Sequence, residues 1–450
     1  MERIDDKSRK KFAKYVSLNI LAMLGSSCYI VADTFFIANG IGADGLTALN
    51  LAISIFSFIQ AIGLMVGIGS GTRYAVSKSR GERETGSQVF TNAIVAGIAA
   101  GCLIGAAGLL FAGPIAEAIG ADQITKGMTS TYLRVIMFFA PFYIVNHTIV
   151  AFVRNDGNPK LATIAMLAGN FSNIVLDYVF IYLFKWGMFG ASFATGIGPV
   201  ISICCLSIHF IKKQNQFKLI RTKVLLQTVV DFCKLGISSF VNELSTGAVI
   251  MIFNFLFLGL GGNTAVAAYG IVANVALFAV SIFTGIAQGI QPLVSDYYGR
   301  GLTNQLKTVL KDAALVALVL TAVIVAVSNV WSDGIVSIFN KSRDTQLQSI
   351  AKEGITIYFL GFFPGSLNIV LAGYLSAMEK AEKGFIISLL RGLVVIAPSA
   401  LLLSKVFGMT GVWTAIPVTE TITLLAALYM TRRIIYPPQS SAEIPQSREL

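Results

Sequence analysis

The stretch "LATIAMLAGNFSNIVLDYVFIYLF", residues 161–184, carries one charged side chain, that of Asp177, in an otherwise mainly apolar run. An α-helix rises about 1.5 Å per residue, so a run of this length can cross the ~30 Å hydrocarbon core of a membrane. The whole chain has this character, because 55% of its 450 residues are hydrophobic and only 13% are charged, against roughly 25% in a soluble domain. The composition predicts an all-α integral membrane protein. The alternating ten-residue strands of a membrane barrel are not seen.

Comparable apolar blocks recur along the chain, separated by short charged or glycine-rich breaks. The first follows the basic run "KSRKKFAK", but it is too long for a signal peptide and lacks a small-residue cleavage site, so we take it as a span. The sequence therefore predicts twelve transmembrane helices, at residues 12–39, 46–72, 88–113, 131–153, 161–184, 188–211, 233–258, 266–291, 311–332, 351–377, 384–406 and 410–434.

Basic residues are distributed unevenly between the breaks, and this asymmetry predicts the orientation, because loops rich in Lys and Arg stay cytoplasmic. The odd-numbered breaks hold few: Lys126, Lys185, Lys341, Arg343 and Lys405. The N-terminus, the even-numbered breaks and the tail hold many: Arg3, Lys7, Arg9, Lys10, Lys11, Lys14, Arg73, Lys78, Arg80, Arg83, Arg154, Lys160, Lys212, Lys213, Lys218, Arg221, Lys223, Arg300, Lys307, Lys380, Lys383, Arg432 and Arg433. Both termini are expected in the cytoplasm. The net charge of +11 then reflects topology beside anionic lipid, and no nucleic-acid partner is expected.

The chain also repeats itself. "GIGSGTRYAVSKSRG", Gly67–Gly81, lines up with "GIAQGIQPLVSDYYG", Gly285–Gly299, and Pro141 lines up with Pro364. The offset corresponds to six spans, an even number, which predicts parallel repeats about an axis along the membrane normal, with a binding cavity between them. The expected parts are an N-terminal lobe at 1–212 (spans 1–6), a cytoplasmic linker at 213–232, a C-terminal lobe at 233–436 (spans 7–12) and a flexible cytoplasmic tail at 437–450.

Motifs of an enzyme are absent from the sequence, so we expect no catalytic activity and no cofactor. The two histidines, His147 and His209, have no Ser or Cys partner in a nucleophile motif, and there is no Walker loop. The five cysteines fall in or beside apolar blocks without metal-ligand spacing, and we interpret them as core residues: Cys28, Cys102, Cys204, Cys205 and Cys233. Any uphill work must draw on an ion gradient or on a partner.

Polar side chains of three spans coincide in depth. Asp33 lies six residues before the outer end of span one, Asp177 seven before that of span five, and Thr195 seven after the start of span six, so all three lie about 10 Å below the outer surface. Asn170, Asn173 and Asp177 are spaced i, i+3, i+7 and share one helix face. This spacing predicts an oxygen cluster of two carboxylates, a carboxamide and a hydroxyl.

Buried carboxylates must be protonated, paired or occupied by a cation. Asp33 and Asp177 could exchange a proton, and with Asn173 and Thr195 they could bind Na⁺. The alternative is that a protonated aspartate merely bonds a neighbouring helix. We favour H⁺ over Na⁺ as the coupling ion, because two acids suffice for a proton whereas five or six oxygens for Na⁺ cannot be enumerated.

Several motifs resemble the multidrug and toxic compound extrusion (MATE) family, in its bacterial form. They are "VADTFFIANGIGADGLTALNLA" (31–52), "SGTRYAVSKSRGE" (70–82), "YLRVIMFFAPFYIVNHTIVAFVRNDGNPKLATIAML" (132–167), "NIVLDYVFIY" (173–182), "GASFAT" (190–195) and "AAYGIVANV" (267–275). The resemblance covers essentially the whole chain. It implies two six-helix lobes in a V shape in the bacterial plasma membrane, cation-coupled export of organic molecules by alternating access, and Asp33, Asn173, Asp177 and Thr195 as the matching site residues.

The second half departs from some relatives, which place acids in spans seven and ten. "PGSLNIVLAG", 364–373, has no acid, and Glu243 lies about one turn early. Glu243 could pair with Arg391 or contact substrate or protons, and Glu420 could pair with Arg391 instead. Arg154, at the cytoplasmic end of span four, is expected to snorkel to the surface.

These features favour an ion-coupled exporter of amphipathic, cationic compounds, acting as a monomer among membrane lipids. The alternative is a flippase for a lipid-linked precursor, which would more often carry several bases in its cavity. Arg391 is the only base that the sequence predicts there. A membrane enzyme is a distant third, because paired acids can do acid/base chemistry but no nucleophile or metal set accompanies them.

Overall fold

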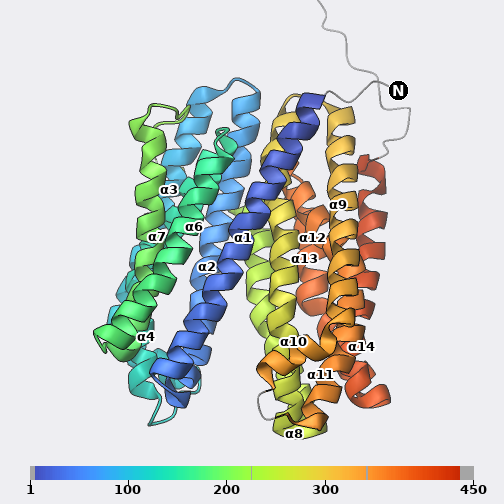
Figure 1. The fold of residues 1–450 in the computed structure, drawn as a ribbon. Coiled ribbons are helices and arrows are strands. Elements are labelled where there is room, and N and C mark those ends of the chain that lie inside the picture. The colour runs from blue at the N-terminus through green and yellow to red at the C-terminus, as the bar shows by residue number, and fades with distance from the viewer. Residues whose placement is uncertain (1–5, 224, 341–342, 436–450) are drawn as a thin grey trace, which may run out of the picture.

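The computed structural model describes residues 6–223, 225–340 and 343–435, and this part of the chain consists of helices joined by short connections, without a strand (Figure 1). The predicted flexible tail at 437–450 and the basic residues Arg3 and Lys341 lie outside the described residues.

The first half of the chain forms six spans. They are α1 (Asp6–Gly40), α2 (Ala43–Ser79), α3 (Arg83–Ala118), the pair α4 (Lys126–Phe138) and α5 (Ala140–Asn155), α6 (Pro159–Asp177) with a π-helix at Tyr178–Leu183, and α7 (Gly187–Ile211). The pair α4 and α5 is bent by 46°. Pro141 stands at the start of α5. Because proline lacks the amide proton that would continue the hydrogen bonding of α4, the two helices form one broken span.

The second half begins with α8 (Leu226–Gly299), whose 74 residues would extend about 110 Å as one straight helix. Its backbone is not helical at Gly261 and Gly262, and Gly262 has a φ of 62° that favours glycine. The helix therefore turns back there and crosses twice. The remaining elements are α9 (Thr303–Val330), α10 (Ser332–Phe339), α11 (Thr345–Tyr358), a 3₁₀ turn at Phe359–Gly361, α12 (Phe362–Ala377), α13 (Ala381–Leu389), a π-helix at Leu390–Val394, and α14 (Ile396–Ile435).

The twelve predicted spans are all found among the described residues. Nine helical stretches there are long and apolar enough to cross a membrane, and the bent pair makes ten. Two further spans arise because α8 reverses at Gly262 and because the stretch Ala381–Arg432 reverses at Gly408, whose φ is 60°. Most helices extend several residues past the apolar blocks. Thus α8 begins at Leu226, inside the stretch predicted as linker, and the lobe boundaries stay predictions.

The spans pack into two lobes, α1–α7 and the helices from α8 onward (Figure 1). One large apolar core lies mainly in the second lobe and includes Phe253, Phe257, Tyr269 and Trp413, and α1 adds side chains to it. Separate clusters in the first lobe include Tyr132, Leu133 and Ile136. Figure 1 also shows that α1 begins and α14 ends at the same end of the bundle, which agrees with an even number of crossings.

The lobes meet closely at the end where α1 begins. A Cβ atom placed on Gly69 of α2 would lie 1.9 Å from the carbonyl oxygen of Phe232 in α8, and one on Gly236 would lie 1.9 Å from that of Met65. Only glycine permits such an approach of two backbones. Towards the other end the lobes splay apart, which gives the V shape seen in Figure 1.

Polar contacts reinforce this junction. Arg73 Nη1 of α2 lies 2.8 Å from Glu379 Oε1, just beyond α12. Gln291 of α8 donates to the Thr72 hydroxyl at 3.1 Å and accepts from the Asn155 side chain at 3.1 Å. These side chains belong to opposite lobes, so the bonds exist only while the lobes are closed at this end.

Candidate functional site

The predicted oxygen cluster forms where α1, α6 and α7 pack together. Asp33 comes from α1, Asn173 and Asp177 from α6, and Thr195 from α7. Their exposed fractions are 6%, 2%, 0% and 5%, respectively. Asp177 is the last residue of α6 before the π-helix at Tyr178–Leu183, and such local widening of a helix is frequent at functional sites.

The two acids are in direct contact. The carboxyl groups of Asp33 and Asp177 lie within hydrogen-bonding reach of each other, so they can share a hydrogen bond when one of them carries a proton. The Oδ1 atoms of both residues are buried without a partner among the described residues. Buried carboxyl oxygens that lack a donor are suited to receive a proton or a cation.

The amide of Asn173 links the acids to α7. In the orientation that satisfies both of its ends, Asn173 donates to Asp177 Oδ2 at 3.2 Å and its oxygen accepts from the Thr195 backbone amide at 3.2 Å. Asn170 shares the stripe but donates instead to the Ser26 hydroxyl of α1 at 3.0 Å. The four residues Asp33, Asn173, Asp177 and Thr195 therefore form one cluster, and Asn170 lies beside it.

Sequence reasoning missed Tyr143 of α5, whose hydroxyl donates to the carbonyl oxygen of Thr195 at 2.7 Å. Tyr143 is buried and follows the proline bend between α4 and α5. The bend directs α5 towards the cluster. The only sequence signal for this bend was the alignment of Pro141 with Pro364 in the internal repeat.

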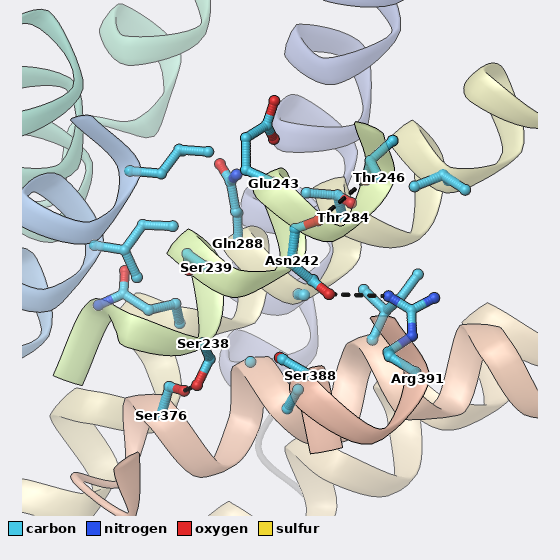
Figure 2. Close-up of a pocket in the computed structure, with 18 of the residues that line it drawn as sticks. Ser238, Ser239, Asn242, Glu243, Thr246, Thr284, Gln288, Ser376, Ser388 and Arg391 are labelled. Atoms are coloured by element: carbon cyan, nitrogen blue, oxygen red, sulfur yellow. Dashed lines mark hydrogen bonds between the residues drawn. The ribbon is translucent and has the colours of Figure 1, made fainter. Parts of the chain in front are cut away.

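The second lobe holds a separate polar group. Arg391, in the π-helix at Leu390–Val394, contacts Glu420 of α14, with Nη2 2.7 Å from Oε1. Asn368 of α12 donates to Glu420 Oε2 at 2.7 Å, and Arg391 donates to Asn242 of α8 at 3.1 Å (Figure 2). Of the two pairings left open by the sequence, Arg391 adopts that with Glu420. Figure 2 shows the Glu243 carboxylate pointing away from Arg391.

Two adjoining cavities occupy the space between the lobes. One, of about 140 Å³, is lined mainly by the second lobe and includes Glu243 and Arg391. The other, of about 270 Å³, reaches Asn173 and Thr195 of the acidic cluster. Arg154, Glu243 and Gln288 line both cavities, so the cluster borders a space that continues to the lobe interface.

Arg154 corrects two predictions. Its side chain does not snorkel, because it is only 4% exposed and donates through Nη1 to Asn19 Oδ1 at 2.6 Å and to Gln288 Oε1 at 2.9 Å. Arg391 is also not the only base facing the cavity, since Arg154 lines it too. Asn19 lies on α1 and Gln288 on α8, and neither spacing nor composition predicted that these helices would meet at Arg154.

A two-lobed bundle of twelve spans, with a central cavity and a buried carboxyl pair beside it, defines the class of polytopic membrane transporters. The MatE family model matches residues 19–179 and again residues 239–401, once in each lobe. The chain belongs to the MATE family, as its sequence motifs predicted.

Named relatives agree over nearly the whole chain. Multidrug export protein MepA of Staphylococcus saprophyticus is 27% identical over 413 residues, which cover 91% of this chain and 90% of the relative. The MepA protein of Staphylococcus aureus strain MRSA252 is 27% identical over 416 residues, with the same shares covered.

Solved structures share the fold. One is the outward-facing conformation of a multidrug resistance MATE family transporter of the MOP superfamily, with a TM-score of 0.90 and 20% identity over 95% of this chain and 96% of that chain. A crystal structure of MATE in complex with MaL6 gives the same values. The observed V shape is therefore the architecture of this family.

Proposed function

We propose that the protein exports amphipathic organic compounds, cationic ones included, by cation-coupled antiport with alternating access. The observation that carries the proposal is the buried Asp33–Asp177 carboxyl pair, 6% and 0% exposed, beside a cavity that continues to the lobe interface. The staphylococcal relatives, which are multidrug export proteins, support the same activity.

The coupling follows from the cost of burying charge. An ionised carboxylate pair in this site is unfavourable until a proton or a cation neutralises it. An ion can shift a conformational equilibrium only by the difference in its affinity for the two states. Moving the populations from 1:99 to 99:1 needs about 5.5 kcal/mol, and a buried acid pair can approach such a difference. H⁺ remains the preferred coupling ion over Na⁺.

The direction of transport follows from the predicted orientation. The end at which α1 begins carries the basic breaks and is cytoplasmic in this proposal. Because the lobes touch at that end through Gly69 and Gly236, the present conformation is the one open away from the cytoplasm. Neutralisation of the acids then accompanies release of substrate outward, and return to the cytoplasm-facing state resets the site.

The experiment uses purified protein in proteoliposomes and a fluorescent organic cation. We expect a pH gradient imposed alone to drive accumulation of the dye, and Asp33→Asn and Asp177→Asn each to abolish it, because an amide keeps the shape but exchanges no proton. Asp231→Asn, at an exposed position of α8, is the matched control and should transport normally. Full activity in both cluster variants would refute the assignment. Accumulation that follows a Na⁺ gradient at clamped pH would replace H⁺ by Na⁺.

A further inference from the structure

Arg154 is a buried cation without an acidic partner. It is 4% exposed, and both of its hydrogen bonds go to neutral side-chain oxygens, those of Asn19 and Gln288. Its Nε has no acceptor in the described part of the chain, and no carboxylate there forms a salt bridge with it. An unpaired buried guanidinium is unfavourable by several kcal/mol, so its retention in a cavity wall calls for an anion.

The surroundings hold this guanidinium in place. The Asn19 amide donates to the Tyr15 carbonyl at 2.8 Å, which turns its oxygen towards Arg154. Gln288 contacts the same Nη1 atom from the opposite lobe. Two neutral acceptors therefore hold one nitrogen of the guanidinium, Nη1, and leave the charge of the group uncompensated beside both adjoining cavities.

Glu243 carries the opposite charge to Arg154 and also lacks a partner of opposite charge among the described residues. It lies on α8 and lines the same two cavities, yet no described residue forms a hydrogen bond or an ion pair with its carboxylate. Figure 2 shows it directed away from Arg391, in a wall that also carries Thr246, Thr284 and Gln288. Arg391 cannot serve as the anion site, because Glu420 already neutralises it.

We infer that Arg154 and Glu243 are the two charged substrate contacts of the central cavity, Arg154 binding an anionic group such as a carboxylate and Glu243 binding a cationic group. This inference rests on the proposed export function and assigns its charge recognition to two named residues. Guanidinium groups match carboxylates with paired, charge-assisted hydrogen bonds, and the neutral hydroxyl and amide groups of the wall tolerate different substrate shapes.

The test uses two dyes that differ only at one carboxyl group: rhodamine 110, a zwitterion with a free carboxylate, and rhodamine 123, its cationic methyl ester. Uptake of each into proteoliposomes under the same imposed ion gradient gives an acid-to-ester rate ratio. We expect the wild-type protein to accumulate both dyes. Arg154→Gln should lower the ratio about ten- to hundredfold, the value of a charge-assisted hydrogen bond, and Arg154→Lys should retain it within a few-fold. Glu243→Gln should lower uptake of both dyes and leave the ratio unchanged, because both carry the cation.

Matched variants separate recognition from a structural role. Gln288→Ala removes the bond between lobes but keeps the guanidinium and its bond to Asn19, so it should slow both dyes and lower the ratio far less than Arg154→Gln does. Arg134→Gln makes the same charge change at an exposed position of α4 and should keep the wild-type ratio. If the Arg154→Gln protein cannot be reconstituted, the affinities of the detergent-purified protein for the two dyes are compared instead of the two uptake rates.

Three outcomes would overturn the inference. An unchanged ratio in Arg154→Gln, with both dyes slowed as in Gln288→Ala, would reduce Arg154 to a contact between lobes. Wild-type accumulation of the ester without the acid would restrict the cavity to cations and leave the proposed export intact. Accumulation of neither dye under either a H⁺ or a Na⁺ gradient would refute the export function itself, and the inference with it.

Discussion

A single methyl group at Gly236 should separate the two lobes. A Cβ there would lie 1.9 Å from the carbonyl oxygen of Met65 and 2.7 Å from the carbonyl carbon. Ordinary contact begins at 3.4 Å, so the carbonyl oxygen is 1.5 Å too close. Both clashing atoms are backbone and cannot rotate away, so α2 and α8 must move apart. Overpacking of this kind costs about 1–3 kcal/mol, which lowers the equilibrium ratio of the present conformation to the separated one by roughly 5- to 150-fold.

The assay is a distance measurement between spin labels at Arg80 and Lys380, on opposite lobes at the closed end. Glu379, next to Lys380, lies 4.0 Å from Arg80 across the junction. Gly236→Ala should shift the distribution to longer distances. Gly247→Ala is the matched control, because it lies on the same helix with no atom within 4 Å of the added Cβ, and it should leave the distribution unchanged. If Gly236→Ala also left both the distances and the thermal stability as in the control, the close approach of α2 and α8 would be refuted.

Two further predictions concern stability. Glu420→Gln should destabilise the protein by about 3–5 kcal/mol, because it leaves Arg391 buried without its partner. The double variant Arg391→Met with Glu420→Gln should recover much of this loss. Thermal unfolding in detergent measures the stability of both variants, and an equal loss in the single and the double variant would contradict the pairing. Near the start of α4, hydrogen bonds from the Thr125 amide and hydroxyl lower the pKa of the exposed Asp122 carboxyl. The contribution of this carboxylate to the stability of the folded helix start is therefore complete above its ordinary pKa of about 3.9. This contribution disappears as the pH falls through the lower pKa of the folded state. Hydrogen exchange of α4, corrected for intrinsic rates, should therefore rise on acidification in the wild type, and an identical rise in Asp122→Asn would argue against this origin.

The sequence was sufficient for the number and position of the spans and for the cluster of Asp33, Asn173, Asp177 and Thr195. Inside lipid each span must satisfy its own backbone hydrogen bonds, so each apolar block specifies a helix without help from its neighbours. Counting residues from the end of a span then gives depth, because the rise per residue is fixed. Depth alone brought Asp33 and Asp177 to one level, where the structure joins them.

The direction in which each side chain points around its helix axis was decided only by the tertiary structure. Arg391 pairs with Glu420 rather than Glu243 because the contact depends on which faces α8, α14 and the π-helix turn towards one another. Arg154 lies near the end of an apolar block, where snorkelling is the local expectation, yet it turns inward to Gln288 of the other lobe. Spacing along one helix carries no information about a partner helix more than a hundred residues away. The close approach of the lobes, made possible by glycines on both sides, therefore determines which charges face the cavity.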